Sequence, residues 1–342
     1  MTFTNKQVLL ASRPTGEPTT GNFRVVEQSL PGPDELGDGQ VLVRHHFLSL
    51  DPYMRGRMNA GKSYAAPQPL DSVMIGGTVG EVVQSRHAGY KAGDKVVGMG
   101  GWQQYSMVDG NAPGMLRRVD TSAVPLSAYL GAVGMPGVTA WYGLTQICAP
   151  KAGQTVTVSA ASGAVGSAVG QLAKARGCRA VGIAGGAEKC RYVVEELGFD
   201  ACVDYKALAD PKALYQALEQ ATPDGVDAHF ENVGGAVLDA VLARMNAFGR
   251  IALCGMVSGY NGAPIPLGQP ALILQSRLML QGFIVSEHME AWPPALKELG
   301  TLVASGKLKY RESVAHGIEA APEAFIGLLK GRNFGKQLVA LV

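Results

Sequence analysis

The feature that most constrains this fold is a strand that runs into a turn of small residues and then directly into a helix. Residues 156–166 read VTVSAASGAVG, and the turn has the form AxxGxxG, a variant of GxGxxG. Small residues let the backbone approach a pyrophosphate, and the helix start offers free N–H groups and a positive dipole end. The segment therefore predicts a dinucleotide site at Gly163, Ala164, Val165 and Gly166. Taken alone, such glycines also arise from helix packing, so the surrounding pattern has to decide.

The chain around this motif alternates strands and helices. Apolar, β-branched runs predict strands at 155–159, 180–183, around Val203, 226–230, 250–254 and 278–285. Helical segments are expected at 166–175, 188–197, 212–220, 237–246 and 293–305. Six strands with intervening helices favour an α/β fold, in which a doubly wound parallel sheet is covered on both faces.

The first 130 residues show a different sequence pattern, without the alternation of strands and helices. Short β-like runs at 40–44, 77–83 and 95–98 are separated by Gly and Pro turns, as in a compact, barrel-like β domain. A chain of 342 residues exceeds the roughly 250–300 that one core usually supports. We expect a catalytic domain at 1–130 and 309–342, with the C-terminal stretch rejoining it, and a nucleotide-binding domain at 131–308.

Composition excludes several classes of protein. The net charge is +2, charged residues make up 17%, and no run of five like charges occurs, which argues against a nucleic-acid partner. No apolar run approaches the roughly 18–20 residues of a membrane span, and the N-terminus lacks a secretory pattern. The five cysteines form no CxxC pair, so a disulfide framework is not expected. We expect a cytoplasmic protein.

The end of the second expected strand distinguishes NAD from NADP. A NAD enzyme usually carries Asp or Glu about 20 residues past the glycines, to bind the ribose hydroxyls. Here residues 183–189 read IAGGAEK, and the strand end is neutral and small. Glu188 falls in the first helical turn, where an acid suits the dipole. Lys189 is placed to meet a 2′-phosphate, which favours NADPH, although by spacing alone it is equally a solvated helix residue.

Zinc chemistry lacks its usual ligands. No cysteine precedes Cys148, and the adjacent His45 and His46 point to opposite faces of a strand-like run. His87 lies in a polar turn. We expect no metal site, so that hydride transfer would act on a substrate that needs no Lewis acid, such as a conjugated double bond.

Matching segments spread over nearly the whole chain give a family resemblance. They are 48–58 (LSLDPYMRGRM), 134–140 (GMPGVTA), 160–166, 231–235 (ENVGG), 254–261 (CGMVSGYN) and 333–336 (NFGK). In these segments the chain resembles the zinc-independent medium-chain dehydrogenase/reductase superfamily, in its prostaglandin, alkenal and curcumin reductase group. The resemblance implies a Rossmann unit and a GroES-like β-barrel catalytic unit.

The resemblance also implies roles for individual residues. Lys189 and Tyr205 would hold the 2′-phosphate, and Asn232 would lie beside the cofactor. The nicotinamide side would be lined by Cys254, Gly255, Met256, Val257, Ser258, Gly259, Tyr260, Phe283, Ile284 and Val285. Asn333 would reach in from the C-terminal segment, and Tyr53 and Tyr260 would lie near the substrate carbonyl.

Plainer explanations stay open for several of these residues. Asn232 and Asn333 are also typical of turn residues. Tyr205 could be a surface aromatic residue, and Tyr53 and Tyr260 could be rings that only pack. Cys254 reads as a small buried neighbour and not as a nucleophile. Met54 and Met58, at helical spacing, read as packing residues. Gln275 stands where mammalian prostaglandin reductases carry a tyrosine, a departure that bears on the binding of prostaglandin-like chains.

The expected activity is NADPH-dependent reduction of the C=C bond of α,β-unsaturated carbonyls, such as alkenals, enones and curcumin-like compounds. A quinone or carbonyl reductase on the same scaffold is the alternative among enzymes. A non-catalytic NADPH-binding or RNA-binding protein is the alternative from another class. Family members are often dimers, and residues 278–285 could pair across a two-fold axis.

Overall fold

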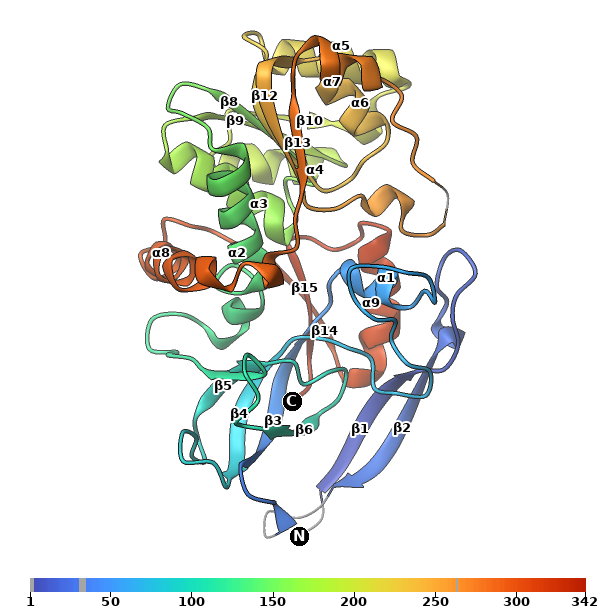
Figure 1. The fold of residues 1–342 in the computed structure, drawn as a ribbon, viewed down its shortest axis with the longest axis vertical. Coiled ribbons are helices and arrows are strands. Elements are labelled where there is room, and N and C mark those ends of the chain that lie inside the picture. Colours follow the sequence, from blue (N-terminus) through green and yellow to red (C-terminus); the bar gives the residue numbers. More distant parts are fainter. Residues whose placement is uncertain (1–2, 31–34, 263) are drawn as a thin grey trace. The chain divides into compact units, whose positions relative to one another are not determined.

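The computed structural model describes residues 3–30, 35–262 and 264–342, which form two compact units. Unit 1 comprises Met1–Leu130 and Glu312–Val342, and unit 2 comprises Gly131–Arg311 (Figure 1). The two units are described separately below. Among the described residues, no helix has the length and apolar character needed to cross a bilayer.

Unit 2 is built on a parallel sheet of six strands. In chain order these are β8 (Thr155–Ser159), β9 (Arg179–Ala184), β10 (Ala201–Asp204), β11 (Val226–Glu231), β12 (Met245–Leu253) and β13 (Met279–Gly282). Their order in the sheet is β10-β9-β8-β11-β12-β13, with every pairing parallel. The chain thus winds outward from β8 in one direction and then from β11 in the other. This confirms the expected doubly wound sheet, whose switch point lies between β8 and β11.

Helices cover both faces of this sheet. They are α2 (Met135–Tyr142), α3 (Ala164–Ala175), α4 (Ala187–Arg191), α5 (Pro211–Ala221), α6 (Ala236–Leu242), α7 (Pro270–Gln275) and α8 (Trp292–Ala304). Leucines of α5 and the apolar side of α6 form one core with Ile183, Val226 and Ile251 of the strands. Helix α3 packs on β8 and β9 and is flanked by α2, which in turn meets α8. Burial on both faces explains why β8 is a continuous apolar and β-branched run.

The helix expected at 188–197 is α4 followed by a π-helical turn at Tyr192–Glu196, and two other expected elements are shorter than their patterns indicated. One is the strand expected at 278–285, which ends at Gly282. The helix expected at 237–246 ends at Leu242, and the strand expected from Arg250 already begins at Met245. Met245 pairs with Val226, and a register shift follows between Val226 and Ala228. Strand pairing therefore overrides helix propensity in this segment, and Phe248 adopts a left-handed φ of 66° in it.

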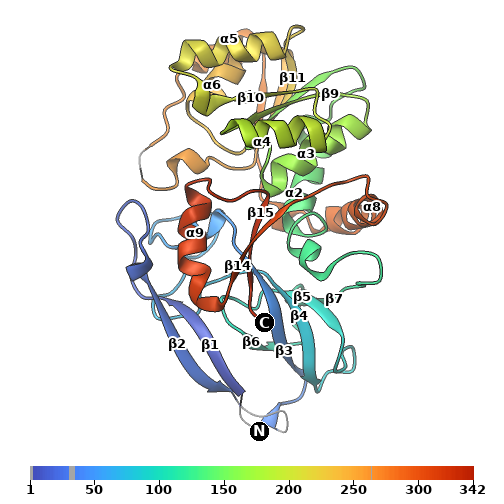
Figure 2. The same cartoon turned by 180° about the vertical axis from the view of Figure 1, so that it is seen from behind.

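Unit 1 holds two sheets. Strands β1 (Phe3–Leu10) and β2 (Phe23–Leu30) pair antiparallel. The larger, mixed sheet contains β14 (Glu312–His316), β15 (Lys336–Ala340), β3 (Gln40–Ser49), β4 (Thr78–Ser85), β5 (Lys95–Gly98) and β7 (Leu116–Arg118), in that spatial order. Strand β6 (Tyr105–Asp109) pairs with β3 outside this path. The unit also contains the helices α1 (Tyr53–Arg57) and α9 (Ala321–Leu329), and α9 is labelled in Figure 2.

The core of unit 1 is centred on aromatic rings. The Trp102 ring stacks on Phe23 at 5.4 Å and meets the edge of Phe325 at 5.6 Å. Met54 and Met58 are fully buried in the same cluster, so they are packing residues as expected. Phe325 comes from α9, so the C-terminal segment supplies part of the same core as the N-terminal strands.

A candidate dinucleotide site at the carboxyl edge of the parallel sheet

The turn between β8 and α3 is shaped by an absence of side chains. Ala160 adopts a left-handed φ of 51°, and Gly163 precedes the first residue of α3. A Cβ placed on Gly166 would lie 2.4 Å from the carbonyl oxygen of Ala160. Only glycine therefore lets α3 start this close to the strand. The N–H groups of the first helical turn, at Ala164 and Val165, have no acceptors within the helix and suit a phosphate.

Asp204 ties the end of β10 to the end of β9. Its Oδ1 accepts the N–H of Gly186 at 2.7 Å and the N–H of Lys206 at 3.1 Å. This carboxylate is therefore engaged with backbone donors. The end of β9 itself carries Ala184 and Gly185, so no acidic side chain stands where an NAD enzyme places one.

Two lysines and a tyrosine gather at this edge. A Cβ on Gly185 would lie 2.9 Å from Cε of Lys206 and 3.0 Å from Cε1 of Tyr205, so both side chains pass directly over this glycine. Lys189 follows in α4, and its pKa is lowered by partial burial and by the positive charge of Lys206. Two like charges held together are an electrostatic cost that a bound phosphate would relieve. Tyr205, 38% exposed, is not a detached surface ring, because it covers Gly185.

A buried polar network stabilises the end of β11. The Glu231 side chain, fully buried, accepts from Ser159 Oγ at 2.6 Å and from the N–H groups of Val233 and Gly234 at 2.5 and 3.0 Å. Its other oxygen lies 2.9 Å from Nε2 of His229, which is also fully buried. Burial opposes ionisation of Glu231, but these donors outweigh it and hold its pKa below the usual value.

Asn232 follows this carboxylate at the strand end. Its Nδ2 donates to the carbonyl oxygen of Ser159 at 2.8 Å, and its N–H donates to Ser159 Oγ at 2.7 Å. These bonds fix Asn232 across the end of β8, close to the turn that precedes α3. Asn232 is therefore more than a turn residue, because its side chain and N–H join the ends of two central strands, β11 and β8.

The segment from Cys254 to Tyr260 docks on the turn that follows Asn232. The N–H groups of Cys254 and Gly255 donate to the Glu231 carbonyl oxygen, and the Val257 N–H donates to that of Asn232. Further bonds run from the Ser258 N–H and hydroxyl to the Val233 carbonyl oxygen, at 3.1 and 2.6 Å. A Cβ on Gly255 would lie 3.2 Å from the hydroxyl oxygen of Tyr260. The structure therefore brings together Asn232 and the expected run of Cys254, Gly255, Met256, Val257, Ser258, Gly259 and Tyr260.

The Cys254 thiol does not behave as a nucleophile in this setting. Burial, with a smaller contribution from the negative charge of Glu231, raises its pKa to about 12. At neutral pH the thiol stays protonated, and only the thiolate reacts readily.

The segment that follows β13 lies beside the central strands. The Phe283 ring meets Phe230 of β11 edge to face at 6.1 Å, and it lies 5.5 Å from Tyr142 of α2. Ile284 is half-buried, Val285 is buried, and the Val285 carbonyl oxygen accepts from Trp292 Nε1 at 3.1 Å.

Tyr53 and Asn333 both belong to unit 1, where their segments are joined. Asp51, two residues before Tyr53, forms a buried ion pair with Lys336, three residues after Asn333. Asn333 Nδ2 donates to the carbonyl oxygen of Gly335 at 2.7 Å, so in this structure Asn333 shapes the turn that enters β15. Tyr53 begins α1 and packs against the aromatic core, while burial and the nearby charge of Asp51 raise its pKa well above the usual range.

Sequence reasoning missed four polar residues of these sites. Lys206 and Asp204 flank Tyr205, and the tripeptide DYK at a strand end was the available signal. His229 and Glu231 alternate along β11 together with Asp227, so the polar residues of this strand share one side, and the two nearest its carboxyl end are fully buried.

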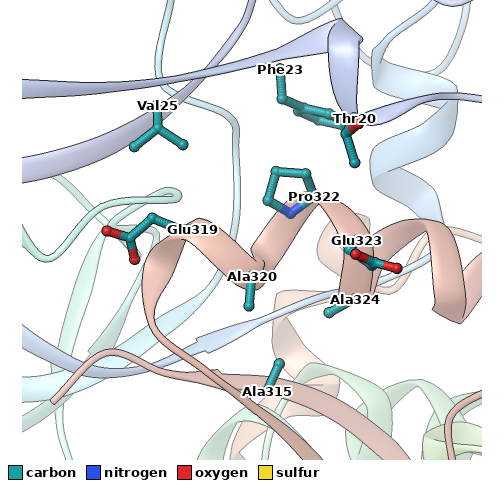
Figure 3. Close-up of a pocket in the computed structure, with 9 residues that line it drawn as sticks. All are labelled: Thr20, Phe23, Val25, Ala315, Glu319, Ala320, Pro322, Glu323 and Ala324. Atoms are coloured by element: carbon teal, nitrogen blue, oxygen red, sulfur yellow. The ribbon is translucent and has the colours of Figure 1, made fainter.

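Unit 1 contains a surface hollow of about 440 Å³, and none of the expected site residues lines it. Figure 3 shows side chains of β2 and of the turn before it on one side, and those of α9, of the turn before it and of Ala315 in β14 on the other. Its only ionisable lining residues are Glu319 and Glu323, and Glu319 pairs with Lys6 at 2.6 Å. We assign no function to this hollow. Within the described part of the chain, no group of three His, Cys, Asp or Glu side chains could hold a metal ion.

A parallel doubly wound sheet with a glycine-shaped turn before its first helix, in a chain that also carries a unit of mixed β-structure, is typical of dinucleotide-dependent oxidoreductases. Comparison with known families agrees. A model described as the N-terminal domain of oxidoreductase matches residues 6–116, and one described as zinc-binding dehydrogenase matches residues 164–301. The chain belongs to the medium-chain dehydrogenase/reductase superfamily, in the group of the curcumin, alkenal and prostaglandin reductases.

Individual relatives match nearly end to end. The chain is 47% identical to the NADPH-dependent curcumin reductase of Escherichia coli, over 98% of this chain and 96% of that one. It is 42% identical to the NADP(+)-dependent 2-alkenal reductase of Nicotiana tabacum, over 98% and 97% of the two chains. The crystal structure of CurA from Vibrio vulnificus in complex with NADPH matches with a TM-score of 0.90 and 44% identity, over 98% and 99% of the chains.

Proposed function

We propose that this protein is an NADPH-dependent reductase of the C=C bond of α,β-unsaturated carbonyls. The observation that carries the choice of cofactor is the edge formed by Gly185, Tyr205, Lys189 and Lys206. Two lysines gather there, the end of β9 carries no acidic side chain, and the nearby Asp204 carboxylate is engaged with backbone N–H groups. The substrate class is supported by the relatives named as reductases of curcumin and 2-alkenals.

In this proposal unit 2 holds the cofactor. The glycine-shaped turn at Gly163 and Gly166 fits a pyrophosphate, because side chains are excluded there. Lys189, Lys206 and Tyr205 would receive the 2′-phosphate. The remaining contacts would come from Asn232, the run from Cys254 to Tyr260, and Phe283, Ile284 and Val285. Unit 1 would supply the catalytic domain, with Tyr53 and Asn333.

When bound, NADPH supplies a hydride to the β-carbon of the substrate. The carbonyl oxygen then carries the negative charge of an enolate, which a hydrogen-bond donor must stabilise. The raised pKa of Tyr53 keeps its hydroxyl protonated and able to donate, and the Tyr260 hydroxyl is the second candidate donor. A proton delivered to the α-carbon, from water or from one of these hydroxyls, completes the reduction. No metal ion is required in this sequence of steps.

The test is NADPH oxidation, followed by absorbance at about 340 nm, with a panel of acceptors. The panel contains a 2-alkenal, an alkenone, curcumin, a quinone and a saturated aldehyde, each repeated with NADH and with a chelator. We expect turnover of the enones with NADPH, unaffected by the chelator. Turnover of only the quinone or the saturated aldehyde would contradict the substrate class, and loss of activity with the chelator would contradict metal-free chemistry.

We also propose a cytoplasmic homodimer that binds no nucleic acid. Strand β13 is an edge of the parallel sheet, and beside it the side chains of Leu274 and Phe248 are 80% and 71% exposed. Exposed apolar residues at a sheet edge favour pairing of two copies. Light scattering should give the mass of a dimer, and the double variant Phe248→Glu/Leu274→Glu should give that of a monomer. The net charge of +2 argues against an RNA partner.

A further inference from the structure

Two cysteines meet beside the proposed 2′-phosphate edge. Cys190 lies in α4 and Cys202 in β10, and both thiols are free. The Cys202 S–H donates to Cys190 Sγ, with the sulfurs 3.1 Å apart. A disulfide needs a separation of about 2.05 Å, so the sulfurs must approach by only about 1 Å to bond.

The backbone makes this approach possible. Cys202 pairs in register with Gly182 of β9, and a Cβ on Gly182 would lie 3.2 Å from Cys202 Sγ. The missing side chain leaves the space that the Cys202 thiol occupies. Helix α4 then brings Cys190 over the same point of the sheet from the turn at Gly186.

The pair is accessible and differs from the other cysteines. Both residues are half-buried, and Cys202 lines a surface depression of about 440 Å³ together with Asp204 and Leu208. The hydrogen bond from Cys202 lowers the pKa of the Cys190 thiol and raises that of Cys202, and burial raises the pKa values of Cys148, Cys178 and Cys254. Cys190 is therefore the cysteine best able to supply a thiolate.

We propose that Cys190 and Cys202 form a redox-active dithiol, which hydroperoxides oxidise to an intrachain disulfide. The Cys190 thiolate attacks one oxygen of the peroxide, the O–O bond breaks, and Cys190 becomes a sulfenic acid while water or an alcohol leaves. The Cys202 sulfur then attacks the Cys190 sulfur, the S–O bond breaks, and the hydroxide leaves as water with the Cys202 proton. Two thiols lose two electrons and two protons, and the peroxide gains them.

The disulfide would alter cofactor binding, a consequence that rests on the proposed function. Lys189 directly precedes Cys190, and Asp204, two residues after Cys202, holds the N–H of Gly186. Formation of the disulfide would draw α4 toward β10. Lys189 would then move away from Lys206 and Gly185, beside which the 2′-phosphate is proposed to bind. We expect the affinity for NADPH to fall by about fivefold, an ordinary size for coupling between two sites, with much less change for NADH.

The experiment treats the full chain with hydrogen peroxide, blocks the remaining thiols by alkylation and digests with trypsin. Trypsin cleaves after Lys189, Arg191 and Lys206, which releases the dipeptide 190–191 and the peptide 192–206. When the disulfide has formed, it holds these two peptides together as one linked species. We expect this linked species in the wild type, its loss after dithiothreitol, and its absence from Cys190→Ser and Cys202→Ser. The matched control Cys178→Ser should still form it. Alkylated Cys190 and Cys202 as the main products, or over-oxidised Cys190 without the linked species, would overturn the proposal.

A second measurement addresses the coupling. The dissociation constants of NADPH and NADH are measured for reduced, oxidised and re-reduced protein, with Cys202→Ser as the variant that cannot close the bond. We expect oxidation to raise the dissociation constant of NADPH in the wild type only, and re-reduction to restore it. Complete disulfide formation with an unchanged NADPH constant would overturn the coupling. Failure of the reduced protein to bind NADPH would instead contradict the proposed function, while the peptide map would still decide the dithiol.

Discussion

Lys336 Nζ lies 2.8 Å from Asp51 Oδ1 in unit 1, and both side chains are almost completely buried. The same ammonium donates to the carbonyl oxygen of Leu50 at 2.6 Å, and the Ser49 hydroxyl donates to the second oxygen of Asp51. The ion pair thus joins the end of β3 to the start of β15. It also sets the segments that carry Tyr53 and Asn333 next to each other.

Removing one partner of this pair should destabilise unit 1 strongly. Lys336→Met leaves a buried carboxylate without its counter-charge, and we expect a loss of about 3–5 kcal/mol in the free energy of unfolding. The control is Lys330→Met, because Lys330 pairs with Glu17 on the surface, with side chains 41% and 46% exposed. That exposed pair should be worth about 1 kcal/mol or less. Equal losses in urea unfolding would show that the Asp51–Lys336 pair contributes no more than a surface contact.

The two lysines beside Gly185 should govern the preference for NADPH. Lys189→Ala and Lys206→Ala should each raise KM for NADPH about tenfold, since a charge-assisted bond contributes about 1.5–3 kcal/mol. KM for NADH should hardly change, because NADH has no 2′-phosphate. Lys212→Ala, on the exposed side of α5, is the matched loss of a positive charge. Parallel increases for both cofactors would place the 2′-phosphate elsewhere.

Tyr53→Phe should change turnover of an enone modestly and not abolish it. The ring packs against the aromatic core, so phenylalanine keeps the packing and removes only the hydroxyl. If that hydroxyl stabilises the enolate together with another donor, kcat should fall while KM for NADPH stays the same. A fall beyond about 10⁴-fold, the upper range for a general acid, would make Tyr53 the dominant proton donor and contradict this expectation. Tyr260→Phe, tested alongside, shows which hydroxyl contributes more.

Acid should destabilise unit 1 through His45. Burial, with the charge of His46, lowers the pKa of this ring to about 3, and its Nε2 lies 2.9 Å from Ser106 Oγ. The unfolded chain takes up a proton near pH 6.5 and the folded chain does not, so stability falls as the pH drops below 6.5. We expect a loss of about 2 kcal/mol between pH 7 and pH 5, from about 1.4 kcal/mol per pH unit. His45→Gln should remove this pH-dependent part of the free energy of unfolding, measured by urea unfolding at several pH values. If the free energy of the variant falls with pH as steeply as that of the wild type, the loss belongs to another group.

The sequence predicted the parallel sheet well, because strands buried on both faces leave continuous apolar runs. Strand β8 matches its expected bounds, β11 is one residue longer at its end, and β9 is one residue longer at each end. The helix before β12 was expected to extend four residues beyond its end at Leu242, because the mixed residues that follow fit either a helix or a strand and only pairing with β11 decides between them.

Contacts between distant residues could not be predicted in the same way. Asp51 and Lys336 are 285 positions apart, and neither spacing nor composition links them. The meeting of Cys190 with Cys202, and of Lys189 with Lys206, depends on how α4 lies over β10. The roles of the site residues in binding and catalysis remain predictions, although unit 2 gathers its own candidates along one edge of the sheet.

Unit 1 is assembled from two segments that are separated in the sequence by the whole of unit 2. Strand β15 pairs with β3, and Phe325 completes the ring cluster around Trp102. Unit 2, in contrast, is one continuous stretch of chain. During synthesis, therefore, the Rossmann unit can fold while the first 130 residues still lack their last strands and helix. A chain stalled before Lys336 would expose the unfinished face of unit 1, where chaperones or proteases could distinguish it from the finished protein.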